Sequence, residues 1–303
     1  MAIVLKLDNE DRLSLREFVD HLETTFDLEE ADSLIGVAPH FRSLANDPDL
    51  IAYHFNAEIQ YVLNAKNERR DVSSPLVIAD APNYCLQANI WMPDAQADAL
   101  RPPSGLSAGV RHAHNHNFNV MTIGYFGPGH IADLYAFNPK AGGGEIGDRV
   151  DLRFTERVCI RKNCAVICRE TVDAHAHVAP EALSISMSLS IFSDNTQVSD
   201  RFVFDPQASA ICGYVDTADV YQRASVVRLA GEVGNEQTLE LFDALLRRSP
   251  CHRVREAALA ATARLTHIDA AERVRVIKRA LKDSNESLRT RAKSLIAQFE
   301  DSM

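Results

Sequence analysis

The fold is decided by two histidine-rich stretches, RHAHNHNFN at residues 111–119 and DAHAH at residues 173–177. Each stretch adjoins strand-like sequence, and alternate side chains of a strand share one face. The histidines expected to share a face are His112, His114 and His116 in the first stretch, and His175 and His177 in the second. If the two strands are neighbours in one barrel, their imidazoles converge. Because neutral imidazole is the commonest protein ligand for transition metals, the pattern predicts a metal site inside β structure.

Composition limits the classes of protein to which the chain can belong. Its 303 residues are enough for two or three domains, and 46% of them are hydrophobic. A net charge of -10 argues against nucleic-acid binding and against attachment to a membrane surface through basic residues. No apolar run reaches the length of a transmembrane helix, and residues 1–8 lack the apolar core of a signal peptide. We therefore expect a cytoplasmic protein whose six cysteines stay reduced.

Three zones follow one another along the chain. Helical spacing of apolar residues marks the first, short strands with Gly and Pro turns mark the second, and repeated helices mark the third. The zones predict an N-terminal helical region over residues 1–72, a β-barrel over residues 73–210 and helical repeats over residues 218–303. The clearest alternation lies at residues 183–191, where serines form one face and apolar residues the other. Such a strand is expected to be half-buried, with its apolar face on a core.

The third zone repeats an Arg-bearing, Ala-rich helix start every thirty-odd residues, at 222–229, 254–261 and 288–295. The junction at residues 280–289 resembles that of HEAT-type repeats. About two and a half repeats fit, too few for a free solenoid, so we expect this zone to pack on the barrel. The residues expected to be buried are Ala224, Val227, Ala258, Leu259, Ala292 and Leu295. The arginines expected to be exposed, as a surface for an acidic partner or a substrate carrier or as a solvated stripe, are Arg247, Arg248, Arg253 and Arg255.

The two histidine stretches, with the turn GYFGPG at residues 124–129 between them, resemble the cupin superfamily. In cupins, an HxH pair on one strand and a single His on a later strand bind the metal. The resemblance covers the middle third to half of the chain and implies His114, His116 and His175 as ligands. It departs from the family where a Glu is expected after the HxH pair, since Asn119 lies nearest and is a poor ligand. Three histidines without that Glu resemble the iron sites of thiol dioxygenases.

Further residues near the two stretches are candidates for catalysis. His112 and His177 are extra histidines that can replace a ligand or act on the substrate. Glu170 is a candidate general base or fourth ligand, with a solvated strand end as the alternative. Tyr125 is a candidate hydrogen-bond donor, with a half-buried barrel tyrosine as the alternative. His130 follows a glycine turn and is expected to be an exposed loop residue.

Together these features predict an α+β protein. A cupin-like antiparallel β-barrel is flanked by an N-terminal helical region and a C-terminal HEAT-like helical domain. The leading function is an Fe(II)-dependent oxygenase that uses O2 and a small polar, amino-acid-like or thiol substrate, with Zn, Mn or Ni as the other metals. One alternative is a non-catalytic, metal-stabilised scaffold whose C-terminal helices bind a protein partner. Another is an O2-independent isomerase or hydrolase. A homo-oligomer is compatible with each function.

Overall fold

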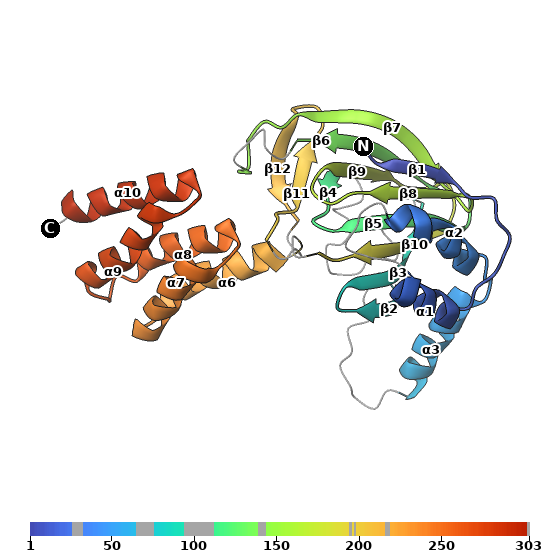
Figure 1. Ribbon diagram of the computed structural model, residues 1–303, viewed down its shortest axis with the longest axis horizontal. Helices are drawn as coiled ribbons and strands as arrows, with labels where there is room; N and C mark the ends of the chain where they lie inside the picture. The colour runs from blue at the N-terminus through green and yellow to red at the C-terminus, as the bar shows by residue number, and fades with distance from the viewer. Residues whose placement is uncertain are drawn as a thin grey trace. The chain divides into compact units, whose positions relative to one another are not determined.

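The computed structural model describes residues 1–25, 33–64, 76–93, 112–138, 144–193, 196, 198–215 and 219–301. The chain divides into two units (Figure 1). The first unit comprises residues 1–196 and 201–213, and the second comprises residues 197–200 and 214–303. The chain therefore enters the second unit briefly before it completes the first. The three predicted domain ranges stay predictions, since residues 72, 73 and 218 lie outside the described residues.

Two antiparallel six-stranded sheets dominate the first unit in the part of the chain that is described. The first sheet has the order β1 (Ile3–Lys6), β8 (Cys164–Cys168), β5 (Asn119–Phe126), β10 (Ser184–Ile191), β3 (Tyr84–Trp91) and β2 (Leu76–Ala81). The second has the order β12 (Ala210–Tyr214), β11 (Phe202–Asp205), β4 (Ala113–Asn115), β9 (Asp173–Val178), β6 (His130–Phe137) and β7 (Leu152–Ile160). The predicted α+β class with antiparallel sheets is confirmed.

Helices α1 (Leu15–Thr25) and α2 (Ser33–Ala45) cover the apolar face of the first sheet, and α3 (Leu50–Asn64) adds Leu50 and Ile51 at its start (Figure 1). Helix α1 begins with a capping box. The Ser14 hydroxyl accepts a hydrogen bond from the Glu17 backbone N–H, and the Glu17 carboxylate accepts one from the Ser14 backbone N–H. Phe18 of α1 and Phe41 of α2 are buried in one core with Leu86 of β3. Helices and sheet therefore bury their apolar faces against each other.

The alternating strand predicted at residues 183–191 is β10, but the expectation that it is half-buried is wrong, because both of its faces are buried. Met187 and Leu189 pack in the core beneath the helices. The serines face the interior between the two sheets. There the Ser188 hydroxyl lies 2.9 Å from the Thr122 hydroxyl and accepts a hydrogen bond from the Asn89 amide at 2.9 Å. The interior face of the first sheet is therefore partly polar.

The second unit is helical in the part that is described. Its helices are α6 (Asp219–Val233), α7 (Glu236–Arg248), α8 (His252–Arg264), α9 (Ala270–Ile277) and α10 (Glu286–Asp301), with a 3-10 turn at Lys278–Lys282. Of the six residues predicted to be buried, those fully buried are Ala224, Ala258, Leu259 and Ala292, and those partly buried are Val227 and Leu295. The classification of these helices as HEAT repeats stays a prediction. None of the described helices has the length and hydropathy needed to cross a membrane.

Two of the four arginines expected to be exposed are instead held within the second unit. Arg253 is 5% exposed and forms an ion pair with Asp200 at 2.8 Å. Arg255 forms one with Asp283 at 2.7 Å. The expectation was wrong for these two because their partners lie far away in the sequence, where helix periodicity gives no sign of them.

Candidate metal centre

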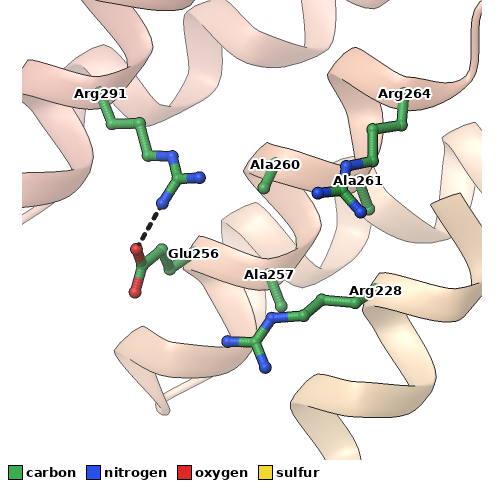
Figure 2. A pocket seen from close by; sticks show the side chains of 7 residues that line it. All are labelled: Arg228, Glu256, Ala257, Ala260, Ala261, Arg264 and Arg291. Carbon is green, nitrogen blue, oxygen red and sulfur yellow. Dashed lines mark hydrogen bonds and ion pairs between the residues drawn. The ribbon is translucent and has the colours of Figure 1, made fainter. Parts of the chain in front are cut away.

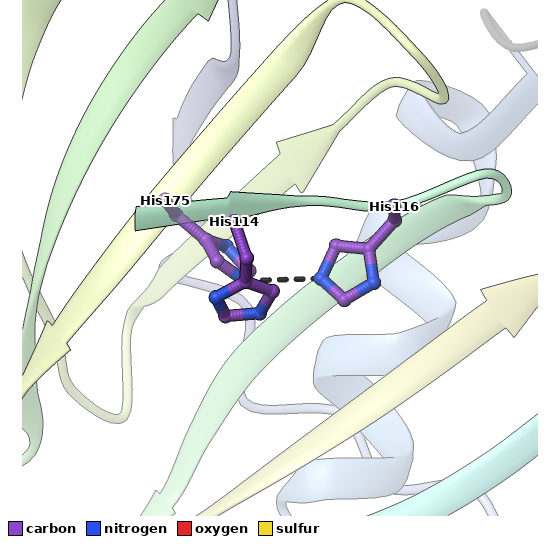
Figure 3. A group of neighbouring side chains, drawn as sticks. All are labelled: His114, His116 and His175. Atoms are coloured by element: carbon purple, nitrogen blue, oxygen red, sulfur yellow. Dashed lines mark hydrogen bonds between the residues drawn. The ribbon is translucent and has the colours of Figure 1, made fainter. Parts of the chain in front are cut away.

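Strands β4 and β9 bring the two histidine stretches together. They pair antiparallel, and His114 and His175 are direct partners in the register. Directly opposed residues of an antiparallel pair project to the same face, which sets both imidazoles on the interior side of the second sheet. His116 follows just after the end of β4, two residues beyond His114, and its ring turns back toward the other two (Figure 3).

The three imidazoles form a compact group. Nε2 of His116 lies 3.0 Å from Nε2 of His175, and one ring nitrogen of each histidine lies within 4.8 Å of the others (Figure 3). When two nitrogen atoms bind one metal ion at roughly 2.1 Å each and the angle between the two bonds is about 90°, the nitrogen atoms lie about 3.0 Å apart. The spacing of His116 and His175 therefore fits neighbouring positions on one metal ion.

Burial keeps the three rings neutral at pH 7. It lowers the pKa of His114 to about 4. It also lowers the pKa values of His116 and His175 well below the usual value for histidine, with further lowering from the neighbouring imidazoles and from the Arg201 guanidinium. Histidine binds a metal through a neutral ring, so no proton has to be displaced near neutral pH.

The outer nitrogens of two rings have contacts that orient them. Nδ1 of His114 lies 3.1 Å from the backbone carbonyl oxygen of His112, an acceptor that fixes the proton on Nδ1 and leaves Nε2 free to bind. Nδ1 of His175 lies 3.5 Å from Sγ of Cys168. Burial raises the pKa of the Cys168 thiol, so the sulfur stays protonated. The Cys168 side chain is itself buried.

The two extra histidines lie in different surroundings. His177 lies next to the group, with its ring centroid 4.3 Å from that of His175 and 6.2 Å from that of His114. His112 is exposed, and only its backbone carbonyl reaches the group. The prediction that His112 shares a face with His114 was wrong because β4 begins at Ala113, so strand alternation does not extend to residue 112.

Tyr125 and Glu170 are not part of the histidine group. Tyr125 lies on the face of β5 that packs beneath the helices, where its hydroxyl donates a hydrogen bond to the Asp47 carbonyl oxygen at 2.8 Å. Its predicted place at the site is therefore corrected. The Glu170 carboxylate accepts a hydrogen bond from the Ser193 hydroxyl at 2.7 Å. The Asn119 side chain accepts one from the Glu170 backbone N–H at 3.0 Å.

His130 and Trp91 extend the histidine group, and sequence analysis missed both. His130 is fully buried, and its ring stacks on the Trp91 indole with centroids 3.9 Å apart. It is not the exposed loop residue expected from the glycine turn, because β6 begins at His130 itself. The pairing of β6 with β9 explains its position. Ala132 is the direct partner of His177, and His130 lies two residues before Ala132, so His130 and His177 face the same interior side of the sheet. The Trp91 indole donates a hydrogen bond to the Ser186 hydroxyl at 2.8 Å, which fixes the indole ring.

Arg201 is a third residue that sequence analysis missed at this site. One guanidinium nitrogen lies 3.5 Å from Nδ1 of His116, and the guanidinium carbon lies 5.3 Å from the centroid of the Phe118 ring. It therefore places a positive charge beside three neutral imidazoles. Residues just before β11 carry no periodic pattern, so this contact could not be predicted from the sequence.

Comparisons with known proteins give little further information. No family model and no curated protein matches the chain. One similar solved structure is hydroquinone 1,2-dioxygenase from Sphingomonas sp. TTNP3 with 4-hydroxybenzoate bound. It is 10% identical with a TM-score of 0.25, and the match covers 40% of this chain and 69% of that chain. Another is RmlC from Streptococcus suis in complex with dTDP-D-xylose, 10% identical with a TM-score of 0.19, covering 37% of this chain and 66% of that chain. The site rests on this chain's own geometry.

Proposed function

We propose that His114, His116 and His175 bind Fe(II), and that the first unit is an oxygenase for a small polar substrate, amino-acid-like or thiol. One observation carries the proposal: three neutral imidazoles from two neighbouring segments of a cupin-like sheet lie within 4.8 Å of one another in its interior. In the described part of the chain this group contains no carboxylate. Three neutral ligands on one side of a six-coordinate ion leave positions for two further molecules.

When bound, Fe(II) supplies redox and Lewis-acid activation of O2 and substrate at the positions that the histidines leave open. The chain's own residues bind and orient. The Arg201 guanidinium, beside His116, attracts an anionic group of the substrate. His177, beside His175, is the nearest further imidazole, and burial lowers its pKa, which leaves the ring neutral at pH 7. The serine face of β10 makes the interior compatible with a polar ligand.

Spectroscopy on the full chain tests this function. The chain is loaded with Fe(II) without oxygen and exposed to nitric oxide, a mimic of O2. We expect the electron paramagnetic resonance signal of high-spin iron–nitrosyl, because the ligand set leaves a position open. Oxygen uptake is then measured with amino acids and small thiols. His112→Ala is the matched control, since that side chain is exposed and lies outside the group.

Three results would count against the oxygenase. The first is stoichiometric zinc that iron does not replace. The second is an iron form that gives no nitrosyl signal. The third is turnover that continues unchanged without O2, which would favour an isomerase or hydrolase at the same ligands.

A further inference from the structure

A surface pocket in the second unit is lined by three arginines from three helices. Arg228 comes from α6, Arg264 from α8 and Arg291 from α10, and Figure 2 shows them around a floor of small side chains. The floor consists of Ala257, Ala260 and Ala261, with Glu256 at one side. Because the floor is formed by alanines, the long arginine side chains stand above it as walls.

Cations outnumber anions in this pocket. Arg291 donates a hydrogen bond to the Glu256 carboxylate at 2.7 Å, and Arg264 donates one to the Glu232 carboxylate at 2.6 Å. Arg228 has no ion pair with any residue that the structure describes. Glu256 is also shared with Arg253 at 3.4 Å, so its charge is divided between two guanidinium groups. The pocket therefore has positive charge that its own carboxylates do not neutralise.

The Arg264–Glu232 pair at the pocket can be exchanged for another at small cost. The Arg264–Glu232 pair is exposed on both sides, 59% and 54%, and Arg291 is 49% exposed. Exposed pairs of this kind contribute about 0–1 kcal/mol, so an incoming carboxylate can take the place of Glu232. Glu256 is only 17% exposed and is shared with Arg253, so an incoming carboxylate adds to it at the exposed side of Arg291. By contrast, Arg253 is buried and Arg255 is half-buried, and both are engaged in ion pairs within the unit. Neither of these two arginines is available to a partner.

The positive pocket contrasts with the charge of the whole chain. The chain carries a net charge of -10 and repels anions in general, so an anion that binds must be held by local contacts. Guanidinium groups that stand on three helices suit several carboxylates spaced along one peptide better than a single small anion. Each guanidinium also matches one carboxylate in planar, two-point geometry.

We propose that this pocket binds an acidic peptide segment of a partner protein, with carboxylates held by Arg228, Arg264 and Arg291. The segment carries Asp or Glu side chains that pair with Arg228, displace Glu232 from Arg264 and bind the exposed side of Arg291. This inference is independent of the metal site in the first unit.

Binding of a fluorescently labelled hexaglutamate peptide to the full chain, measured by anisotropy at low salt, tests the proposal. Arg228→Gln is expected to weaken binding about fivefold, which corresponds to about 1 kcal/mol. Glu232→Gln is expected to tighten it about twofold to threefold, because it frees Arg264. Arg248→Gln is the matched control, since Arg248 is an exposed arginine on α7 outside the pocket and the change in net charge is the same. It is expected to leave affinity unchanged.

Three results of the same measurements would overturn the proposal. If hexaglutamate does not bind, or if Arg228→Gln and Arg248→Gln weaken it equally, no acidic peptide is recognised by the pocket. If inorganic phosphate competes with the peptide as strongly as a second acidic peptide does, the pocket is a site for small anions instead. A thermal melt of each variant, expected to match that of the unmodified chain, excludes loss of folding as the cause.

Discussion

At the scale of single residues, His130 is an imidazole that the fold buries without hydrogen bonds. It is fully buried, and neither ring nitrogen has a hydrogen-bond partner among the described residues. Burial lowers its pKa to about 3. An unsatisfied buried polar group destabilises a protein by about 1–3 kcal/mol. We therefore predict that His130→Phe, which keeps the stack on Trp91, raises the free energy of unfolding of the metal-free chain by about 1 kcal/mol in urea titrations. A less stable variant would mean that the ring nitrogens hold a partner.

The buried His114 makes stability depend on pH. Its pKa is about 4 in the folded chain, against 6.5 for an ordinary histidine. Between these values the unfolded chain binds a proton that the folded chain does not, so stability is lost as pH falls from 6.5 toward 4. For His114 alone the loss between about pH 7.5 and about pH 5 is about 2 kcal/mol. Urea titrations of the metal-free chain at both pH values measure it.

The same titrations on His114→Asn are expected to show a smaller difference between the two pH values. The exposed His112→Asn variant is expected to behave as the unmodified chain does. Equal pH dependence in all three chains would show that burial of His114 does not control its protonation.

Strand alternation predicted the face on which a side chain lies only for residues inside the strand. It placed His114 and His175 on one face correctly, because β4 and β9 include both. It misplaced His112, since β4 begins one residue later. It gave no indication of Arg201, which approaches His116 from 85 residues away. Long-range approaches of this kind depend on tertiary packing and leave no periodic trace in the sequence.

At the scale of elements, the serine face of β10 is a polar layer whose members depend on one another. The Ser188 hydroxyl accepts a hydrogen bond from Asn89 of β3 and lies 2.9 Å from the Thr122 hydroxyl of β5. Ser188→Val removes the shared hydroxyl and leaves both neighbours without it, so we predict a loss of about 2 kcal/mol in the free energy of unfolding. Chemical denaturation measures this, with Met187→Leu on the opposite face as a control that changes stability little. Equal loss in both variants would contradict the polar layer.

Helices α6 and α8 approach each other closely at a glycine. A Cβ atom on Gly231 would lie 2.7 Å from Cβ of Ala261, well inside normal contact. Alanine favours a helix over glycine by about 1 kcal/mol, so helix propensity alone predicts that Gly231→Ala stabilises. We predict that the steric clash dominates and that the melting temperature falls, because the contact involves backbone as well as side chain. Val233→Ala, on the exposed side of α6, is the control. A raised melting temperature would show that the helices can move apart freely.

The sequence predicted the existence of most elements but not what covers them. The pattern of β10 identified the strand and its two faces correctly. It did not reveal that helices cover one face and the second sheet the other, because covering elements come from distant parts of the chain. Strand β1, which pairs with β8, was missed for the same reason, since a four-residue run has too few positions to show a period.

At the scale of the whole molecule, the two units carry separate chemistry. The first holds three histidines in a sheet interior, and the second holds basic and acidic side chains on helices. Residues 197–200 belong to the second unit, where Asp200 forms an ion pair with the buried Arg253, and the following residues, which include β11, belong to the first unit. Composition along the chain predicted a β-rich zone followed by a helical zone. It could not predict that residues 197–200 belong to the second unit, because four residues are too few to alter the composition of a zone.

Metal content of the full chain tests the central claim most directly. The chain and its variants are incubated with Fe(II) without oxygen, desalted and analysed by mass spectrometry for metal per chain, with circular dichroism to confirm folding. The account predicts about one iron per chain in the unmodified protein and in His112→Ala, because the exposed His112 lies outside the group. It predicts that His114→Ala and His175→Ala each lose most of the iron while remaining folded. Full occupancy in either folded ligand variant, or no iron in the unmodified chain, would contradict the three-histidine site.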